Sequence, residues 1–273
     1  MYKLVLFISL VFIIQSCRKD AITLSKHPSQ QFIIIGHAYG NPVDYELSLY
    51  KELPAFIKTL NLFVNPVTYV FTGDVVAKPT AENWENILIQ FDSLNINDYW
   101  IAPGNHDLGS NYFQENIQTN IYFAERIDSN LFFVLNTNFS GWTIDQSQID
   151  LLYSELSDLS GINNIFVFTH QVWWANPKDA VYDIDSIRTN STNLIEGSHS
   201  FWTDAFPMFQ SANLPTYFFA GDVGCWDFIP AYVENKHDNF HFYASGVGGG
   251  LEDNVLYLKI GESEQVEIER ISF

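Results

Sequence analysis

Short apolar runs alternate with longer amphipathic segments through the first part of the chain. The short runs predict buried strands, because a strand covered on both faces is apolar without interruption. The segments between them repeat apolar residues every three or four positions, which predicts helices, the first of them bent at Pro54. The predicted strands span residues 32–35, 67–72 and 99–102, and the predicted helices span residues 44–63 and 80–94. This β-α-β-α-β order predicts a parallel sheet covered by helices.

The pattern changes in the second half, where short strands and turns become more frequent. A hairpin is predicted around 128–130, and Asp145 is expected to cap a helix with its side chain. A long polar loop at 171–198 is typical of a functional segment. The other predicted elements are strands at 121–127, 131–136, 164–169 and 216–220, helices at 145–159 and 200–212, and three or four antiparallel strands within 228–273, with a glycine turn at 246–250 between two of them. Together the halves predict an α/β fold, a two-sheet α/β sandwich of mixed strands flanked by helices, in one domain over residues 32–273.

The N-terminus has the pattern of a targeting segment. Lys3 precedes an apolar run at 4–14 that is too short to span a bilayer. The run leads to Cys17 and resembles a bacterial lipoprotein signal, in which the peptide is cut before a cysteine that then carries lipid. We therefore expect a signal peptide at 1–16, a lipidated Cys17 and tether at 17–31, and a lipid-anchored protein of the bacterial cell envelope, on the outer membrane or periplasmic face rather than in the cytoplasm. An ordinary secretory peptide or an N-terminal membrane anchor is the alternative.

Charge and cysteine usage narrow the possible partners. The formal net charge of −19 argues against a nucleic-acid partner, because binding phosphate backbones needs a basic face. It does not exclude a phosphate substrate, since a bound divalent cation can supply local positive charge. Acidity that only keeps the surface soluble is the alternative. If Cys17 carries lipid, Cys225 has no partner within the chain and the fold relies on its core. The membrane is then a partner through Cys17, and no protein partner is indicated.

Five of the expected strands end in a polar turn. In open α/β sheets, ligand sites form at the carboxyl ends of strands, and glycine lets the backbone turn sharply there. The Asp, Asn and His side chains of these turns are metal ligands, so the ordered set predicts a metal site. The five turns are Gly36-His37-Ala38-Tyr39-Gly40, Gly73-Asp74, Gly104-Asn105-His106-Asp107, Thr169-His170 and Gly221-Asp222-Val223-Gly224.

This ordered set resembles the motifs of the calcineurin-like metallophosphoesterase family, over roughly residues 32–250. The strand end Leu135-Asn136-Thr137, the helix start at Gln146 and the turn Ser245-Gly246 are similar to secondary features of that family. The resemblance implies a metallophosphoesterase-like sandwich and hydrolysis of a phosphomonoester or phosphodiester, hence a small phosphate-ester substrate. It also implies two divalent metals that share one aspartate.

The resemblance assigns roles by position in the motifs. Asp74 would be the carboxylate shared by both metals, and Asn105 and His170 would bind the second metal. His106 would be the acid that protonates the leaving group, with Asp107 orienting it.

Two turns depart from the family pattern. His37-Ala38-Tyr39 stands where the family has Asp-x-His, and Gly221-Asp222-Val223-Gly224 stands where it has Gly-His-x-His. Glycine offers no ligand and neutral tyrosine is a poor one, so the first metal position is weakened or empty. Asp222 can replace an imidazole at the second position, and His37 is a weaker candidate ligand. We therefore expect one tightly held ion, which the donor set does not assign to Zn, Mn, Fe or Mg.

The same departures favour a competing interpretation, in which a degenerate family member binds a ligand or glycan without turnover. Aromatic residues beside the turns suit either function, because they can stack a sugar or base at a site mouth. The candidates for lining the substrate are Tyr39, Trp173, Trp174 and Trp226, with His199 at the start of the helix after the long loop. Ordinary core packing is the alternative for the tryptophans.

Overall fold

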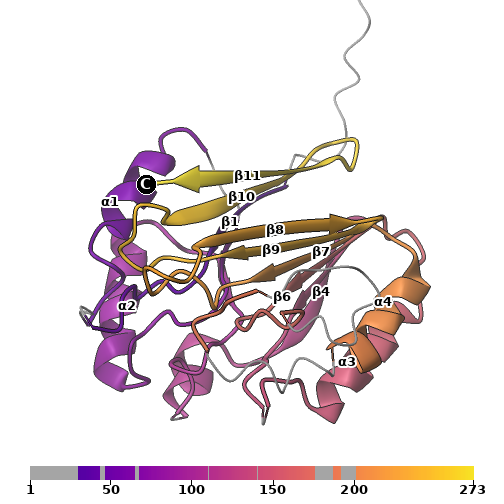
Figure 1. Ribbon diagram of the computed structural model, residues 1–273, viewed down its shortest axis with the longest axis horizontal. Coiled ribbons are helices and arrows are strands. Elements are labelled where there is room, and N and C mark those ends of the chain that lie inside the picture. Colours follow the sequence, from indigo (N-terminus) through magenta and orange to yellow (C-terminus); the bar gives the residue numbers. More distant parts are fainter. Residues whose placement is uncertain are drawn as a thin grey trace, which may run out of the picture.

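Two β-sheets lie face to face in the computed structural model, and helices cover the outer side of each sheet (Figure 1). The structure describes residues 30–43, 47–64, 68–109, 111–139, 141–175, 187–191 and 201–273. The first sheet contains β1 (Gln30–Ile35), β2 (Thr68–Phe71), β3 (Tyr99–Ile101), β10 (Asn254–Ile260) and β11 (Val266–Ser272). The second sheet contains β4 (Phe123–Ile127), β5 (Asn130–Val134), β6 (Asn164–Phe168), β7 (Thr216–Ala220), β8 (Tyr232–His237) and β9 (Phe240–Ser245). The helices are α1 (Leu53–Leu60), α2 (Ala81–Ser93), α3 (Gln146–Leu156) and α4 (Phe206–Ala212), with π-helical turns at Phe113–Ile117 and Phe201–Ala205.

The strand orders are β11-β10-β1-β2-β3 and β4-β5-β6-β7-β9-β8. Each sheet contains a run of parallel neighbouring strands: β1, β2 and β3 in the first, and β5, β6, β7 and β9 in the second. Parallel strands have their carboxyl ends at one edge of a sheet, so the turns after them gather there. The predicted α/β sandwich of mixed strands with flanking helices is confirmed.

The core lies in three apolar layers that follow from the alternation of side chains along each strand. In β1, Phe32 and Ile34 face the second sheet, whereas Ile33 and Ile35 lie in the layer beneath α1 and α2. The layer between the sheets is rich in phenylalanine, which accounts for part of the aromatic content of the chain. Its buried phenylalanines are Phe32, Phe132, Phe166, Phe168 and Phe219.

The first helix is shorter than predicted. We expected a helix over 44–63 bent at Pro54, whereas α1 begins at Leu53 and places Pro54 in its first turn. Proline is favoured there because its missing N–H is one that a helix start leaves unpaired. The apolar residues Leu47 and Tyr50 therefore lie in non-helical backbone, within the described residues 47–52. The cap predicted for α3 is confirmed, since the Asp145 side chain accepts a hydrogen bond from the Gln148 N–H.

The C-terminal strands form two antiparallel hairpins that join different sheets. The first hairpin is β8–β9, and its strand β9 pairs in parallel with β7. The second hairpin is β10–β11, and β10 pairs with β1 in the other sheet. The glycine turn at 246–250 therefore carries the chain from one sheet to the other. Its N–H groups at Gly248, Gly249 and Gly250 all donate to the Asp253 carboxylate, which leaves them unavailable to a phosphate.

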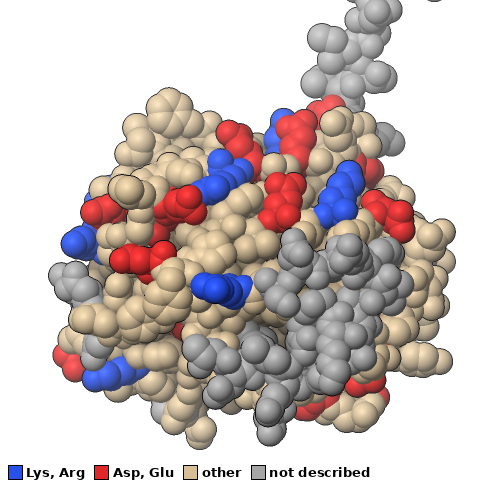
Figure 2. Space-filling view, viewed as in Figure 1, with Lys and Arg blue, Asp and Glu red and all other residues tan. Residues whose placement is uncertain are grey.

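Charged residues protect the exposed edge of the first sheet. Figure 2 shows acidic and basic side chains mixed over the region of β8, β10 and β11. In this region Lys259 Nζ lies 3.4 Å from Glu267 Oε2 across the β10–β11 hairpin. Charges on an edge strand discourage pairing with another chain.

The predicted signal peptide, lipidated Cys17 and most of the tether lie outside the described residues, as does His199. None of the described helices is long and apolar enough to cross a membrane.

Candidate metal and catalytic site

The turns after the parallel strands meet because glycine leaves room for them. A Cβ atom on Gly73 would lie 2.4 Å from Nδ1 of His170, and one on Gly221 would lie 2.0 Å from the Thr72 carbonyl oxygen. Gly73 also has a φ of +80°, which favours glycine. Any larger residue at these positions would push the two sheets apart at their carboxyl ends. The glycines of the sequence pattern therefore serve close approach.

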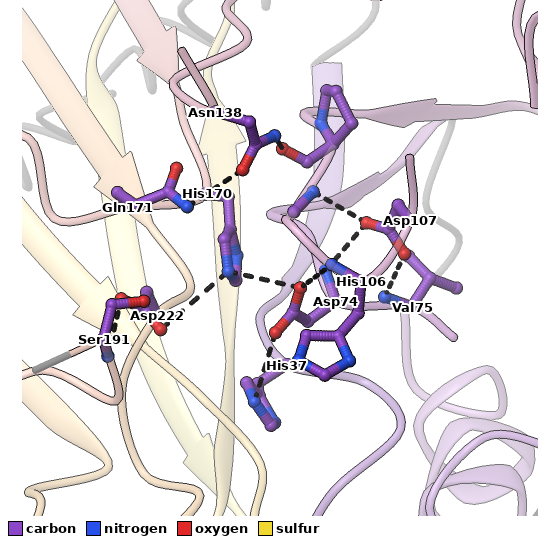
Figure 3. Close-up of polar contacts among 12 residues, drawn as sticks. His37, Asp74, Val75, His106, Asp107, Asn138, His170, Gln171, Ser191 and Asp222 are labelled. Carbon is purple, nitrogen blue, oxygen red and sulfur yellow. Dashed lines mark hydrogen bonds and ion pairs between the residues drawn. The ribbon is translucent and has the colours of Figure 1, made fainter. Parts of the chain in front are cut away.

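Four titratable side chains converge where the carboxyl ends of the two sheets meet (Figure 3). His170 Nε2 lies 3.3 Å from Asp74 Oδ1 and 3.8 Å from Asp222 Oδ1, and His37 Nε2 lies 3.4 Å from Asp74 Oδ2. All four residues are buried. The turns after β1, β2, β6 and β7 supply one residue each, so the sequence prediction that these turns meet is confirmed.

The tautomer of His170 gives this cluster the character of a cation site. Its Nδ1–H donates to the Thr72 carbonyl oxygen over 2.9 Å, which leaves a lone pair on Nε2 in the neutral ring. Nε2 is buried and has no hydrogen-bond partner, although the carboxylates of Asp74 and Asp222 face it. A lone pair facing two anions is unfavourable unless a cation lies between them. The donor set fits a divalent ion, with His170, Asp74 and Asp222 as its ligands.

The arrangement is nevertheless looser than a finished metal centre. Among the described residues, no group of three or more His, Cys, Asp or Glu side chains is already arranged to hold an ion. The 3.8 Å between His170 Nε2 and Asp222 Oδ1 is the longest of the three separations. The support for a cation therefore comes from the buried His170 Nε2 facing two carboxylates, a position that a proton or a divalent ion can fill, and not from a preformed cage.

Electrostatics set the charges of His170, Asp74 and His37 in the metal-free protein. Burial alone would lower the pKa of His170, but Asp74 and Asp222 outweigh it and raise the pKa to about 10. Burial would raise the pKa of Asp74, and the neighbouring His170 and His37 instead hold it well below its usual range. A proton on His170 thus takes the place of the cation at neutral pH. Burial lowers the pKa of His37 to about 4 against the opposing effect of Asp74, so that ring is neutral.

Asp74 and His37 both have backbone conformations that favour glycine. Their φ angles are 53° and 52°. Residues other than glycine with positive φ angles are uncommon and concentrate at functional sites. Asp107 holds the turn of Asp74 in place with its buried carboxylate, which accepts hydrogen bonds from backbone N–H groups. The four donors are Asp74 (2.8 Å), Val75 (2.8 Å), Val76 (3.2 Å) and Gly104 (2.7 Å).

The expected role of Asp107 is therefore corrected. We predicted that it orients His106, but its oxygens point at the backbone of the Asp74 turn. The His106 ring is instead held through Nδ1, which lies 2.8 Å from the Ala77 carbonyl oxygen. Since a carbonyl only accepts, Nδ1 carries the proton and Nε2 is left to exchange one. The backbone N–H of His106 donates to Asp74 Oδ1, which ties it to the cluster.

Asn105 and Tyr39 lie beside the cluster in different ways. Asn105 is exposed, so the structure brings its turn to the site but not its side chain into the buried group. Tyr39 is buried, and its ring lies 4.5 Å from that of His37 and 5.2 Å from that of His106. Tyr39 thus packs between two of the histidines rather than offering a free surface.

Comparison with known proteins decides the family. The sequence model of the calcineurin-like phosphoesterase family matches residues 47–226 of this chain. The chain belongs to the calcineurin-like phosphoesterase family. Members of this family typically bind divalent metals. The match ends just after the turn that carries Asp222.

Solved structures share the fold of this calcineurin-like phosphoesterase at low sequence identity. GAP50, described as the anchor in the inner membrane complex of Plasmodium, matches with a TM-score of 0.52 and 13% identity, covering 90% of this chain and 85% of that one. A protein assigned as a 5′-nucleotidase from Staphylococcus aureus, solved with α-ketoglutarate, has a TM-score of 0.50 and 13% identity, covering 89% of this chain and 53% of that one. A search of the curated proteins finds no match.

One of the two altered family turns is closed to a ligand by its backbone. Gly224 has a φ of +80°, and a Cβ there would lie 2.9 Å from the Cα and Cβ of Ala231. A histidine at this position would require the chain to shift. The absence of a ligand at Gly224 is therefore built into the turn.

The predicted aromatic walls are in large part core. Trp173 and Trp174 are 0% and 1% exposed, and their rings pack against Phe201, Phe218 and Phe242. The interpretation of these two residues as substrate-lining is therefore wrong, because an apolar pair after a strand end can turn under the sheet as easily as over the site. Trp226 is partly buried, and its ring stacks on Phe228 at 6.4 Å.

Sequence reasoning missed the contacts that hold Asp222. The Ser191 N–H donates to Asp222 Oδ2 over 3.2 Å, and Asn190 N–H donates to the Asp222 carbonyl oxygen over 2.9 Å. These contacts leave Asp222 Oδ1 facing His170. Burial raises the pKa of Asp222 to about 6, with His170 opposing the shift. The only available signal was the polar composition of the long loop, which does not say which residue returns to the site.

Proposed function

We propose that this chain is a metal-dependent phosphoesterase that holds one divalent ion tightly and hydrolyses a phosphomonoester or phosphodiester. The observation that carries the proposal is the buried His170 Nε2, which lies 3.3 Å from Asp74 Oδ1 and 3.8 Å from Asp222 Oδ1 and has no hydrogen-bond partner. The membership of a phosphoesterase family supports the reaction class. When bound, such an ion neutralises a phosphoryl oxygen and activates water near neutral pH.

The remaining chemistry belongs to residues of the chain. His106 is the proton donor to the leaving oxygen in this proposal: its Nδ1 proton stays hydrogen-bonded to the Ala77 carbonyl oxygen, and the proton given up is a second one, carried on Nε2 of the imidazolium. A positioned general acid contributes about 10²–10⁴-fold to rate. Asp107 keeps the turn of Asp74 closed, and Tyr39 supports the rings of His37 and His106. Tyr39 and Gly224 leave the first metal position of the family without its usual ligands.

We further propose that the protein works in the bacterial cell envelope, anchored through a lipid on Cys17. The support is the sequence pattern of Lys3, the apolar run at 4–14 and the cysteine that follows it. A polar stretch to about residue 31 then separates the anchor from β1. Mass spectrometry of the protein purified from membranes tests this, because an intact, unlipidated N-terminus would exclude the lipoprotein assignment.

A second function is a ligand- or glycan-binding protein that has lost turnover. It is favoured by the exposed position of Asn105 and by the missing ligand at Gly224. GAP50, whose fold is similar, is described as an anchor, and a binding role of that general kind is the alternative. The retained pair of Asp74 and His106 argues for the enzyme, because binding alone does not require a proton donor beside the cation site.

Metal content and hydrolysis together separate the two functions. The protein spanning residues 18–273 is loaded with Mn²⁺ or Zn²⁺, its bound metal is counted, and generic phosphomonoesters and diesters are assayed. We expect about one ion per chain and hydrolysis that Asp74→Asn abolishes, whereas Asp92→Asn on the exposed face of α2 serves as the matched control. Metal without hydrolysis supports the binding protein. Two equally tight ions would contradict the single metal position. A protein that binds no metal and hydrolyses none of these substrates would exclude the enzyme.

A further inference from the structure

A chain of amide groups, buried at Gln171 and partly buried at Asn138, joins the two sheets beside the site. Gln171 directly follows His170 at the end of β6, Asn138 follows β5, and Pro103 follows β3 in the other sheet. The Gln171 Nε2–H donates to Asn138 Oδ1 over 3.0 Å, and the Asn138 Nδ2–H donates to the Pro103 carbonyl oxygen over 2.7 Å (Figure 3). The path therefore runs from the residue after His170 to the residue before the Gly104 turn.

The buried end of this path has few alternatives. Gln171 is completely buried, and its Oε1 accepts a hydrogen bond from the Thr137 hydroxyl. Its backbone is held on both sides, because its carbonyl oxygen accepts from Thr169 Oγ1 over 2.9 Å and its N–H donates to Thr137 Oγ1 over 3.3 Å. With Oε1 committed to Thr137, Nε2 is left to reach Asn138. The orientation of the Gln171 amide is thus fixed by its partners on both atoms.

We propose that Gln171 and Asn138 form an inter-sheet brace that sets the distance between His170 and the turn of Asn105 and His106. The proposal rests on the proposed function, because it assigns to the brace the placing of a metal ligand relative to the proton donor. The His170 ring is another direct tie between the sheets here, through Nδ1 and the Thr72 carbonyl oxygen, and the Val247 N–H donates to the Gly36 carbonyl oxygen farther along. If the His170 ring held the sheets together here without the brace, a change in the distance between them would rotate the ring. The contacts of Gln171 and Asn138 hold that distance, so Gln171 and Asn138 are positioning residues.

Loss of the brace has a defined consequence for metal affinity. Gln171→Leu keeps a buried side chain of similar length but removes both contacts of the Gln171 amide. Asn138→Ala removes the links on both sides of Asn138, to Gln171 and to Pro103, together with its contact to Asn136. We expect each to weaken Mn²⁺ binding by about 10- to 100-fold, since groups that orient a metal ligand have effects of this size. The double variant should bind Mn²⁺ no more weakly than the more impaired of the two single variants, because both substitutions break the same path.

The opposite ends of the same strands supply a matched control. Asn164, at the start of β6, donates from its buried Nδ2 to Asn130 Oδ1 at the start of β5 over 3.0 Å. Asn164→Leu therefore removes an amide-to-amide bond between the same two strands, away from the site. If Gln171 only stabilises the fold, Asn164→Leu and Gln171→Leu will lower Mn²⁺ affinity equally.

Two measurements keep the brace and the proposed function separate. Mn²⁺ binding is followed by the spin-resonance signal of the free ion, and hydrogen exchange of residues 103–108 is followed by mass spectrometry in metal-free protein. Faster exchange of 103–108 and weaker Mn²⁺ binding in Gln171→Leu and Asn138→Ala, with neither in Asn164→Leu, supports the brace. Unchanged exchange in Gln171→Leu, or equal Mn²⁺ loss in Asn164→Leu, overturns it. If the unaltered protein binds no Mn²⁺, the proposed function fails, and the exchange of 103–108 still decides whether the brace exists.

Discussion

Replacement of Asp107 by asparagine tests whether this residue is structural or part of a proton relay. Its two carboxylate oxygens are shared evenly, because Oδ1 accepts from Val75 and Val76 and Oδ2 accepts from Asp74 and Gly104. Asparagine presents one oxygen and one NH₂ group in the same space. The NH₂ group cannot accept, so two buried backbone N–H groups lose their partner and face another donor.

The size of the effect follows from those two groups. A buried donor without a partner costs about 1–3 kcal/mol, so the free energy of unfolding should fall by about 2–6 kcal/mol. That is a large share of the roughly 5–15 kcal/mol that holds a typical domain folded. Burial and the Asp74 charge raise the pKa of Asp107 to about 6, so the comparison is made at pH 8, where its carboxylate is ionised.

Urea unfolding of the metal-free protein, followed by tryptophan fluorescence, gives the two free energies. The exposed Asp92→Asn substitution is the control and should change the free energy of unfolding by less than about 0.5 kcal/mol. The alternative role, orientation of His106, predicts nearly unchanged stability and a large loss of hydrolysis. A stability within 1 kcal/mol of the unaltered protein, on this roughly 2–6 kcal/mol scale, would refute our account of the turn.

Three further predictions concern the charges and the backbone of the site. Asp74 and Asp222 outweigh the effect of burial and raise the pKa of His170 to about 10. Divalent metal binding at pH 7–8 should therefore release about one proton from His170, and the metal affinity should rise with pH toward 10. Calorimetry in buffers of different ionisation enthalpy measures the proton release, and its absence would contradict the prediction. Burial lowers the pKa of His37 to about 4, so the stability that the neutral His37 ring contributes is full above pH 6.5 and is lost as the pH falls from 6.5 toward 4. His37→Gln should therefore flatten the dependence of the free energy of unfolding on pH across that window, measured by urea unfolding. An unchanged slope would exclude the effect. Gly224→His should not restore a second metal but should destabilise the protein by about 1–3 kcal/mol, because of its φ of +80° and the contact with Ala231, and a gain of a second tight ion by metal analysis would show that the turn can adapt.

The sequence predicted the gathering of the site well, because it depended on strand ends and glycine. Gly73-Asp74 and Thr169-His170 each follow an apolar run, and parallel strands with their carboxyl ends at one edge bring such turns together. Spacing alone did not reveal what each side chain would touch. Asp107 follows His106 directly, yet it reaches the backbone of a different turn. Which donor the Asp107 carboxylate contacts depends on how its own turn and the turn of Asp74 fold against each other.

The misassigned elements share one physical cause, which is that apolar spacing does not distinguish kinds of burial. Leu47 and Tyr50 continue the helical spacing of α1 although their backbone is not helical, and Pro54 marks the true start only once its place in the first turn is known. Trp173 and Trp174 stand beside a metal-ligand candidate in sequence, but their rings fill the layer under α4. Apolar periodicity finds buried residues and leaves open whether they line the core or the site.

The two altered turns differ in physical kind, and this difference bears on the chemistry. Tyr39 is a side-chain change, since a histidine would need little backbone adjustment at a residue packed between His37 and His106. Gly224 is a backbone change, because its positive φ and the nearby Ala231 exclude any side chain. No single substitution therefore returns a ligand to both places. The other half, in which His170 faces Asp74 and Asp222, is held by contacts that are independent of Gly224, among them the Asp107 carboxylate and the Thr72 carbonyl oxygen. In the function proposed above, hydrolysis would draw on one cation and the His106 proton, which would tie activity to the geometry of a single turn pair.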